Sequence, residues 1–370
     1  MNNYNDILSI QNWFPQLNDK NNILIAGPCS AETEEQVLNT AIAISKIPEA
    51  EIFRAGIWKP RTRPGSFEGV GEIGLEWLKK VKEKTGLLTC VEVATVEHIK
   101  LCKEHKDSVD ILWIGARTTV NPFSVQELAD VLLNCNKPIM IKNPVNPDLN
   151  LWIGAIERIY KSGIKKIAAV HRGFSAFEPS KLRNIPKWEI PIELKIQFPD
   201  LSIINDPSHI AGKPEYIAEI AQYALDLNMN GLMIETHINP KAALSDAKQQ
   251  ITPKELSELL KKLEYRLPEN DNPNFNNNLE QFRYKIDSID HQILELLSYR
   301  MDIVENIAKY KAENNVSILQ LKRWREIISN RLKFADEHNL DKDFVKTLLE
   351  LVHTESIKKQ KRIFNLKKES

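Results

Sequence analysis

Three side chains of the kind that bind metal ions follow short apolar runs in this sequence, and a fourth lies on a loop nearby. Cys29 follows the run at 23–26, His209 the run at 203–204, and Glu235 the run at 231–234, while Asp246 lies on a loop further on. Asn-Asp-Pro at 205–207 cannot continue a strand, so His209 is expected at the carboxyl end of one. A lone buried cysteine or a capping aspartate is common without a metal. Together, however, a thiol, an imidazole and two carboxylates at strand ends predict a site for a divalent transition metal such as Mn, Fe, Co or Zn.

Basic side chains recur at the ends of four further apolar runs. A single Lys or Arg at such a rim is usually solvated, but repetition at corresponding positions predicts a pocket for two anionic groups, phosphate or carboxylate. The sequence therefore indicates a phosphorylated substrate. The basic residues and the neutral ones between them are Arg54, Lys59, Pro60, Arg61, Thr62, Arg117, Lys142 and Arg172.

The elements that must position these side chains alternate between strand-like and helix-like segments from about residue 22 to 265. The apolar runs lie at 23–26, 51–55, 87–93, 110–115, 138–142, 165–170, 201–204 and 231–234. Amphipathic stretches separate most of them, at 34–44, 72–84, 125–133 and 215–227. Eight such units predict an α/β fold, a closed (β/α)8 TIM barrel of about 250 residues. A doubly wound open sheet is the alternative, and the prolines within 186–199 predict a short or irregular sixth helix.

Composition and charge limit the possible classes of protein and the expected partners. The chain has 370 residues, of which 42% are hydrophobic and 27% charged, which predicts two folded domains. Its 50 Lys and Arg balance 50 Asp and Glu, so neither nucleic acid nor a membrane surface is an expected partner. The four cysteines show no CxxC spacing, which is typical of reduced thiols in a cytoplasmic protein.

One glycine-rich segment imitates a dinucleotide-binding motif. Gly69, Gly71 and Gly74 have the G-x-G-x-x-G spacing, and Glu92 follows about 20 residues later. However, Pro60, Pro64 and Gly65 precede the glycines, so that no strand leads into them. We therefore expect a loop that enters the second helix.

Five motifs of the first 265 residues belong together. They are Gly27-Pro28-Cys29-Ser30, the segment 54–62, Gly115-Ala116-Arg117, Asp206-Pro207-Ser208-His209, and Glu235 followed by Ala243-Leu244-Ser245-Asp246. These motifs resemble those of 3-deoxy-D-arabino-heptulosonate 7-phosphate (DAHP) synthase, the first enzyme of the shikimate pathway. The resemblance covers the whole segment and is to the shorter, core-barrel kind, so no regulatory extension is expected before the barrel.

The resemblance implies roles for the residues already singled out. Cys29, His209, Glu235 and Asp246 would bind the metal. Arg117, Lys142 and Arg172 would hold phosphoenolpyruvate near Arg54, and Lys59 and Lys142 would be catalytic, with Lys59 between the two substrates. Pro60, Arg61 and Thr62 would meet erythrose 4-phosphate. A sibling enzyme that uses arabinose 5-phosphate has an Asn-rich variant of this Lys-Pro-Arg-Thr segment, so the motif here favours the four-carbon sugar and an aldol-like condensation.

The composition changes after residue 265. Residues 266–278 are rich in Asn, Asp and Pro and predict a linker between a barrel domain at 1–265 and a helical domain at 279–370. Three helices are expected, at about 279–314, 320–338 and 341–364. Apolar residues follow heptad spacing along the first helix, which leaves a dimerisation helix as one possibility. They are Leu279, Phe282, Ile286, Ile289, Ile293, Leu296, Ile303, Ile307 and Tyr310.

Arg300 lies on the same apolar seam and requires an anionic partner there. Lys311 is 11 residues further on, about 20° around the helix and about 16 Å along it, so both side chains can reach one small ligand. Arg283 is roughly 25 Å away in the other direction. If Arg283 takes part, it must come from an antiparallel partner chain, which favours a homodimer through this domain, with shared sites.

The spacing of several polar residues in the helical domain resembles the all-helical type of chorismate mutase. The matching positions are Arg283, Asp290, Arg300, Lys311, Arg323, Ser356 and Gln360. By resemblance, Arg283 and Arg300 would bind the two carboxylates of chorismate or prephenate, and Lys311 and Gln360 would be catalytic at the ether oxygen. Gln320 stands where the family often has Asp. Trp324 stands where it has a Glu that contacts the substrate hydroxyl.

Three functions are open for the helical domain. The first is a mutase in a bifunctional enzyme, with expected feedback by prephenate on the barrel. The second is a sensor that binds chorismate or prephenate without turning it over. The third is a plain dimerisation helix, against which Arg300 and Lys311 argue.

Overall fold

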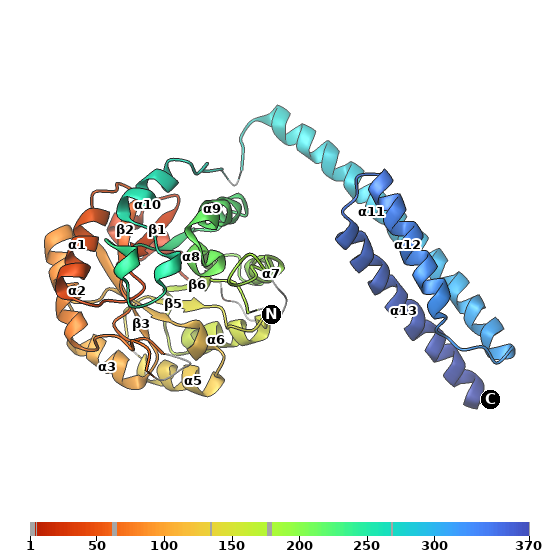
Figure 1. Cartoon of the computed structure of the whole chain (residues 1–370), viewed down its shortest axis with the longest axis horizontal. Helices are drawn as coiled ribbons and strands as arrows, with labels where there is room; N and C mark the ends of the chain where they lie inside the picture. Colours follow the sequence, from red (N-terminus) through yellow and green to blue (C-terminus); the bar gives the residue numbers. More distant parts are fainter. Residues whose placement is uncertain are drawn as a thin grey trace. The chain divides into compact units, whose positions relative to one another are not determined.

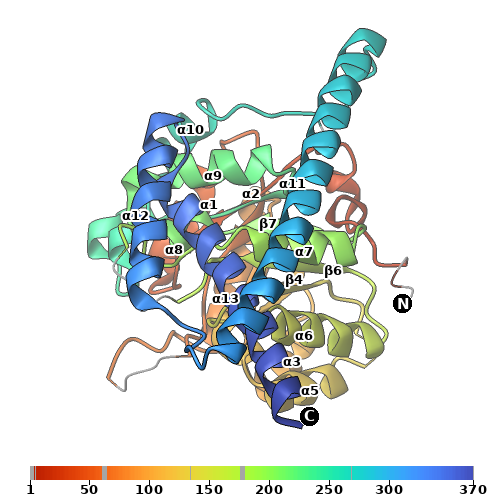
Figure 2. The ribbon, with the colours of Figure 1, turned by 90° about the vertical axis from the view of Figure 1, so that its right-hand side faces the viewer.

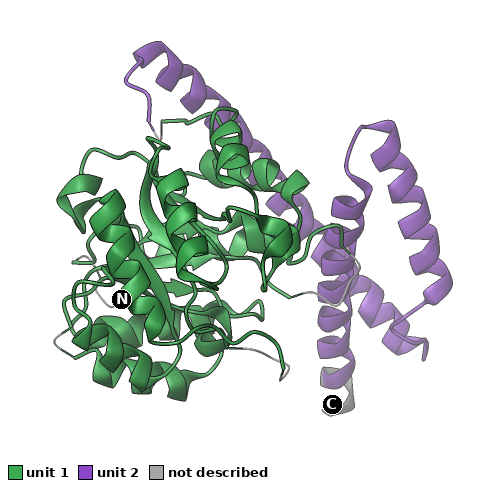
Figure 3. Cartoon of the chain, turned by 60° about the vertical axis from the view of Figure 1, so that its left-hand side comes forward, with its two compact units in different colours: residues 1–268 green, residues 269–370 purple. Residues whose placement is uncertain are grey.

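The chain divides into two compact units, Met1–Pro268 and Glu269–Ser370 (Figure 3). The structure is a computed structural model and describes residues 4, 6–60, 65–133, 135–175, 180–267 and 269–369. Arg61 and Thr62 lie outside the described residues.

Eight parallel strands close into a barrel in which each strand pairs with its neighbours in chain order and β8 pairs with β1 (Figure 1). The predicted TIM barrel is confirmed, and the open sheet is wrong. Each strand lies within a residue or two of a predicted apolar run. The strands are β1 (Ile23–Gly27), β2 (Ala50–Arg54), β3 (Leu88–Val93), β4 (Ile111–Ile114), β5 (Ile139–Lys142), β6 (Ile167–His171), β7 (Ser202–Asn205) and β8 (Gly231–Glu235).

Helices surround the barrel, and their ends carry recognisable caps. Thr33 accepts a hydrogen bond from the Gln36 amide at the start of α1, and Thr252 forms a capping box with Glu255 at the start of α10. The helices are α1 (Glu34–Ile44), α2 (Ile73–Thr85), α3 (Val96–Glu104), α4 (Ala116–Thr119), α5 (Pro122–Val131), α6 (Leu149–Lys161), α7 (Glu189–Gln197), α8 (Pro207–Ala211), α9 (Ile217–Asp226) and α10 (Pro253–Leu260). Helix α7 has nine residues, as many as α3; it accommodates Pro191 in its first turn, where no intrahelical donor is lost.

The interior of the barrel is filled by apolar side chains and closed at its amino-terminal end by the segment before β1. Ile10, Trp13 and Leu17, from two short 3-10 helices, pack against inward-facing strand residues. This segment fills the amino-terminal end of the barrel interior, and TIM-barrel enzymes place their chemistry at the opposite end, at the carboxyl ends of the strands. The inward-facing residues are Ile23, Ile25, Ile52, Leu88, Cys90, Ile111, Trp113, Met140, Ala168, Val170, Ile204 and Met233.

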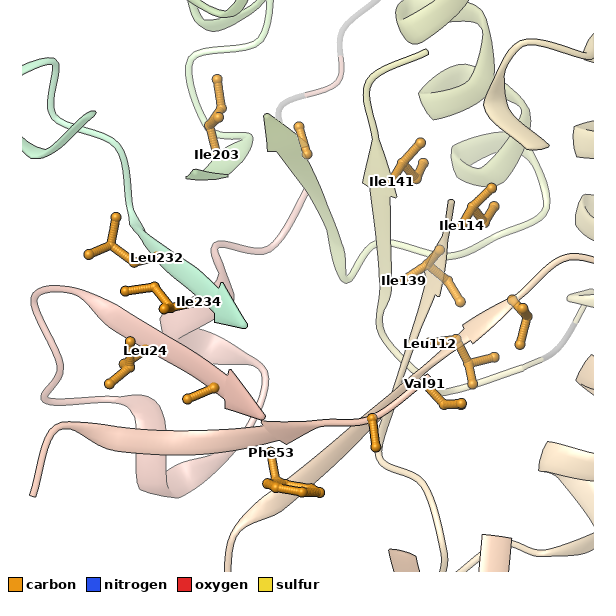
Figure 4. Close-up of a cluster of buried hydrophobic side chains, with 14 of the residues drawn as sticks. Leu24, Phe53, Val91, Leu112, Ile114, Ile139, Ile141, Ile203, Leu232 and Ile234 are labelled. Atoms are coloured by element: carbon orange, nitrogen blue, oxygen red, sulfur yellow. The ribbon is translucent and has the colours of Figure 1, made fainter. Parts of the chain in front are cut away.

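A second apolar layer lies between the strands and the surrounding helices. Leu24, Phe53, Val91, Leu112 and Ile141 point outward from their strands, alternating with the inward set (Figure 4). Because the strands are buried on both faces, they are continuous apolar runs in the sequence. The barrel thus forms a rigid frame for the polar groups at its rim.

The second unit consists of three long helices, α11 (Pro273–Glu313), α12 (Leu321–Glu337) and α13 (Lys342–Glu369). Helix α13 packs against both α11 and α12 (Figure 2). Helix α11 begins six residues before the predicted position, because Asn272 caps it and Pro273 occupies its first turn. Residues 273–278, which the sequence placed in the linker, are therefore helical. Within the described chain, no helix combines the length and the apolar character needed to cross a membrane.

Candidate active sites

The four predicted metal ligands come together at the carboxyl ends of the barrel strands. Ligand atoms of Cys29, Glu235 and Asp246 all lie within 4.8 Å of one another, and the Cys29 thiol is 3.4 Å from Oδ2 of Asp246. Nε2 of His209 lies 3.6 Å from Oε1 of Glu235 and 3.9 Å from Oδ2 of Asp246. Donor atoms about 2.0–2.3 Å from one shared ion would lie a few ångströms apart, as these do. The arrangement fits a metal ion.

Local backbone geometry delivers these ligands. Gly27 ends β1 at φ 144°, where a Cβ atom would lie 2.1 Å from the Arg54 carbonyl oxygen, so only glycine allows this close approach before Cys29. Asp246 has φ 47°, a left-handed conformation that is uncommon outside glycine and that clusters at functional sites. His209 lies in α8, directly after β7.

The tautomer of His209 is set by Asp206. Nδ1 of His209 lies 2.8 Å from Oδ2 of Asp206, which is fully buried, so Nδ1 carries the proton and donates it to the carboxylate. Burial would raise the pKa of Asp206, but the interaction with His209, including its hydrogen bond, and the charge of Lys142 hold it well below its usual range. Burial lowers the pKa of His209, which favours the neutral imidazole. Its Nε2 lone pair is thus available to a metal.

The thiol and the carboxylates of the cluster differ in charge. Burial and the neighbouring Glu235 raise the pKa of Cys29 to about 12, so the free thiol is protonated and a bound metal must displace that proton. Glu235 accepts hydrogen bonds from Arg54 at 3.1 Å and from Gln249 at 2.6 Å. Both partners hold its carboxylate facing the cluster.

A cavity of about 260 Å³ opens beside the metal cluster. Basic side chains dominate its lining, as predicted, and Lys142 is held at its wall by an ion pair of 2.7 Å with Asp206. The predicted residues that line it are Lys59, Pro60, Arg117, Lys142, Arg172, His209 and Asp246. Such a cavity suits a small ligand with two anionic groups.

Contacts within the site show which groups remain for a ligand. Nζ of Lys59 donates to the Cys29 carbonyl at 3.0 Å, which places this amine between the cavity and the cluster. Burial lowers the pKa of Arg172 to about 10, which leaves it charged at neutral pH, and its guanidinium donates to Asn184 at 2.9 Å. Arg54 lies over the ring of Trp113 at 5.1 Å, and its Nε and Nη1 are buried without a partner.

Sequence reasoning missed several side chains at this site. Asp206 belongs to one of the motifs that carry the resemblance, but no role at the site was predicted for it. Arg183 and Asn184 line the cavity from the irregular segment after β6, and Arg183 pairs with Asp246 at 3.0 Å. Glu92 also lines the cavity from the end of β3, with its carboxylate where a Cβ of Gly115 would lie. Only Glu92 had a signal, its position at the end of an apolar run.

The glycine-rich segment forms a loop that leads into α2, as expected. Gly69 and Gly71 have positive φ angles, and no strand of the described chain lies between β2 and α2. The dinucleotide interpretation is therefore wrong.

In the helical unit, the structure brings some of the predicted residues together. Nη1 of Arg300 on α11 donates to Oγ of Ser356 on α13 at 2.6 Å. Gln360 lies one turn after Ser356 on the same face of α13, and its Oε1 is buried without a partner. Lys311 donates to the Ile318 carbonyl at 2.6 Å. Partial burial lowers the pKa of both Arg300 and Lys311.

Other predicted residues of this unit stay apart from that group. Arg283 is exposed near the start of α11 and pairs with Glu280 at 2.6 Å. Gln320 and Arg323 are exposed at the start of α12, and Asp290 is exposed on α11. Within one chain, Arg283 is too far along α11 to reach a ligand at Arg300, as the helical rise predicted.

The barrel with its cluster and cationic cavity defines an enzyme of the TIM-barrel class that acts on anionic substrates. Residues 14–267 match the DAHP synthetase I family, and residues 282–361 match chorismate mutase type II. The chain belongs to the DAHP synthetase I family, whose members are generally metal-dependent, and carries a chorismate mutase domain at its C-terminal end. It is a bifunctional shikimate-pathway enzyme with DAHP synthase and chorismate mutase activities.

Known relatives share the barrel unit. The phospho-2-dehydro-3-deoxyheptonate aldolase of Thermotoga maritima is 33% identical over 243 residues, which cover 65% of this chain and 69% of the relative. The crystal structure of the Thermotoga maritima DAHP synthase matches with a TM-score of 0.59 and 31% identity, over 65% of this chain and 68% of that one. A 2-dehydro-3-deoxyphosphooctonate aldolase of Geobacter sulfurreducens is 26% identical over 265 residues, 66% of this chain and 92% of the relative.

Proposed function

We propose that the barrel unit joins phosphoenolpyruvate to erythrose 4-phosphate in the cavity beside Cys29, His209, Glu235 and Asp246. The observation that carries this proposal is the cationic lining of that cavity directly next to a cluster of metal-binding type. The donor set mixes a thiol and an imidazole with carboxylates, which suits Mn, Fe, Co or Zn better than Mg or Ca. When bound, such an ion supplies Lewis acidity to the aldehyde oxygen of the sugar.

The side chains of the cavity position the two anions. Arg117, Lys142 and Arg172 come from three successive strand ends and hold the phosphate and carboxylate of phosphoenolpyruvate. Lys59 lies between the cavity and Cys29, at the boundary of the two substrates. We assign the sugar phosphate to the Lys-Pro-Arg-Thr segment, of which Arg61 and Thr62 lie outside the described residues.

The test compares two sugars on the full chain. Consumption of phosphoenolpyruvate is measured with erythrose 4-phosphate or with arabinose 5-phosphate, before and after a chelator and after metal is added back. We expect turnover only with the four-carbon sugar, lost with the chelator and restored by a transition metal. Equal rates with both sugars would show that the specificity assignment is wrong. Activity that is unaffected by the chelator would show that the reaction needs no metal at this site.

For the helical unit, we propose that Arg300, Lys311, Ser356 and Gln360 surround chorismate and that fixed positive charge promotes its rearrangement to prephenate. Arg300 and Ser356 are already joined across α11 and α13, and Oε1 of Gln360 has no partner within the protein. The loss of chorismate absorbance on addition of the full chain tests the activity. Binding of prephenate by calorimetry without turnover would instead indicate a sensor.

We propose that two copies of the chain associate through α11. Four residues of its predicted seam, Phe282, Ile286, Ile289 and Ile293, are between 49% and 60% exposed and form one apolar stripe that the described residues of the helical unit leave uncovered. A second copy would cover the stripe and could bring Arg283 to the ligand at Arg300. Ile289→Glu should convert the dimer to a monomer in sedimentation, whereas Tyr299→Glu, an equally exposed position outside the heptad set, should not. A wild-type monomer would rule out this association.

We also propose feedback by prephenate. Prephenate bound at Arg300 and Lys311 would favour one arrangement of the two units and lower the synthase rate, with reciprocal coupling of the two binding equilibria. Synthase rate is measured against prephenate concentration for the full chain, for a chain ending at Leu267 and for Arg300→Ala. Inhibition that persists in the shortened chain would place the effector site in the barrel. A full chain that prephenate does not inhibit would show that the helical unit has no role in feedback.

We propose a cytoplasmic location, because Cys29, Cys90, Cys102 and Cys135 are all free thiols. Reduced thiols of this kind suit a reducing compartment, and Cys29 must stay reduced to bind a metal. Fractionation of cells with an antibody against the chain tests the location, and recovery outside the cytoplasm would contradict it.

A further inference from the structure

Two buried polar atoms of the helical unit have no hydrogen-bond partner. Among the residues described between 269 and 369, these are Oε1 of Gln360 and Nε2 of His353. A buried polar group without a partner is unfavourable. It therefore indicates that a bound ligand supplies the missing hydrogen-bond partner. Gln360 already has a role in the function proposed for this unit, whereas His353 has none.

His353 lies on the face of α13 that carries the ligand-binding residues. Ser356 and Gln360 follow it by three and seven residues, which returns the helix to nearly the same direction. Ser356 is hydrogen-bonded to Arg300, so this face of α13 looks onto the basic group of α11. His353 therefore belongs to the same site by position.

The imidazole plane is held in place by Trp324 on α12. The two rings are stacked, with centroids 3.9 Å apart and planes 9° from parallel. Stacking fixes the plane of the ring, and in-plane Nε2 is then aimed in a defined direction. Trp324 therefore orients the imidazole of His353, which could not be predicted from the sequence.

The imidazole is suited to a neutral hydrogen bond. Burial lowers the pKa of His353, and the charges of Arg300 and Lys311 lower it further. At neutral pH the ring is therefore uncharged and can exchange one hydrogen bond with an uncharged ligand group. A carboxylate of the ligand has a stronger partner in the guanidinium of Arg300.

We propose that Nε2 of His353 hydrogen-bonds the ring hydroxyl of chorismate, with Trp324 holding the imidazole in position. This inference rests on the function proposed for the helical unit. It explains how the site can recognise the hydroxyl although Trp324 occupies the position of the glutamate that contacts this group in the family it resembles. His353 and Trp324 together would take over the role of that single carboxylate.

The experiment measures kcat/KM of the full chain for chorismate and for an analogue in which the hydroxyl is replaced by hydrogen. His353→Phe keeps a flat ring for stacking but removes the hydrogen bond, and His353→Gln places an amide nitrogen near the position of Nε2. His338→Phe is the matched control, because His338 is also stacked on an aromatic ring, Phe334, at 3.8 Å, on the exposed end of α12.

We expect His353→Phe to lower kcat/KM for chorismate about tenfold, His353→Gln to recover part of this loss, and His338→Phe to have no effect. The analogue should be turned over equally by wild type and His353→Phe. Equal losses for both ligands, or wild-type turnover by His353→Phe, would overturn the role of His353. If Arg300→Ala also left turnover unchanged, the proposed function of the unit would fail instead. If His353→Phe did not fold, an unchanged kcat/KM in His353→Ala would overturn the inference.

Discussion

Replacing Asp206 by asparagine removes one charge from the buried centre of the barrel site while keeping the size of the side chain. The carboxylate now accepts from three groups: the His209 amide at 3.1 Å, Nδ1 of His209 at 2.8 Å, and Nζ of Lys142 at 2.7 Å. An asparagine has one acceptor oxygen and one amino group. If its oxygen faces His209, its amino group faces the Lys142 ammonium, and the reverse orientation sets the amino group against the donor at Nδ1.

The expected magnitude follows from the position of Asp206 behind His209, a proposed metal ligand. Loss of a group that orients a ligating histidine typically weakens metal binding 10- to 100-fold, which is about 1.4 to 2.7 kcal/mol. Lys142 also loses its only carboxylate ion pair among the described residues, so the KM for phosphoenolpyruvate should change together with the metal affinity.

Metal affinity is measured by competition with a coloured chelator on the folded, full-length chain, with phosphoenolpyruvate kinetics in parallel. Asp110→Asn serves as the control, because Asp110 forms an equally short ion pair of 2.7 Å with Lys82 but lies before β4, away from the cavity. Equal metal affinity in Asp206→Asn and wild type would refute the claim that Asp206 sets the tautomer of His209.

Three further outcomes are expected. Cys29→Ala should lose bound metal and DAHP formation while chorismate turnover continues; metal content by mass spectrometry and both assays check this. Arg300→Ala or Lys311→Ala should lower chorismate turnover at least 100-fold, since each removes a charge that faces a dianion, whereas the exposed Lys333→Ala should not. Burial lowers the pKa of His171 to about 4, so its NMR signals should not shift above about pH 5. Because the unfolded histidine binds its proton near pH 6.5, stability should fall as pH drops from 6.5 toward 4, by about 1.4 kcal/mol per unit, and less in His171→Gln.

The barrel could be predicted because its strands are buried on both faces. Such strands are continuous apolar runs in the sequence. Their alternation with amphipathic segments is compatible with two folds, a closed barrel and an open sheet. Closure depends on the pairing of β8 with β1, a contact between residues about 200 positions apart that no local pattern encodes. The start of α11 was missed because Asn and Pro, which usually break a helix, here occupy its cap and first turn.

The meeting of Cys29, His209 and Glu235 was also predictable, because each lies at or shortly after the end of a strand and strand ends converge in a barrel. Arg183 and Asn184 were not, since they lie in an irregular segment whose path depends on tertiary contacts, such as the pair of Arg183 with Asp246. His353 was missed for another reason. A single histidine on an amphipathic helix is ordinary, and only its stacking on Trp324 and its unpartnered nitrogen set it apart.

Both sites share one physical feature, buried polar atoms that the protein itself leaves without partners. In the barrel these include Nε and Nη1 of Arg54, and in the described part of the helical unit they are Nε2 of His353 and Oε1 of Gln360. Each such atom costs about 1–3 kcal/mol in the free chain, and a ligand that pairs with it recovers this energy on binding. The rigid barrel can maintain its groups because many buried apolar contacts hold the backbone around them. The same groups favour ligands with matching polar atoms, since an analogue that lacks one leaves the protein group unpaired.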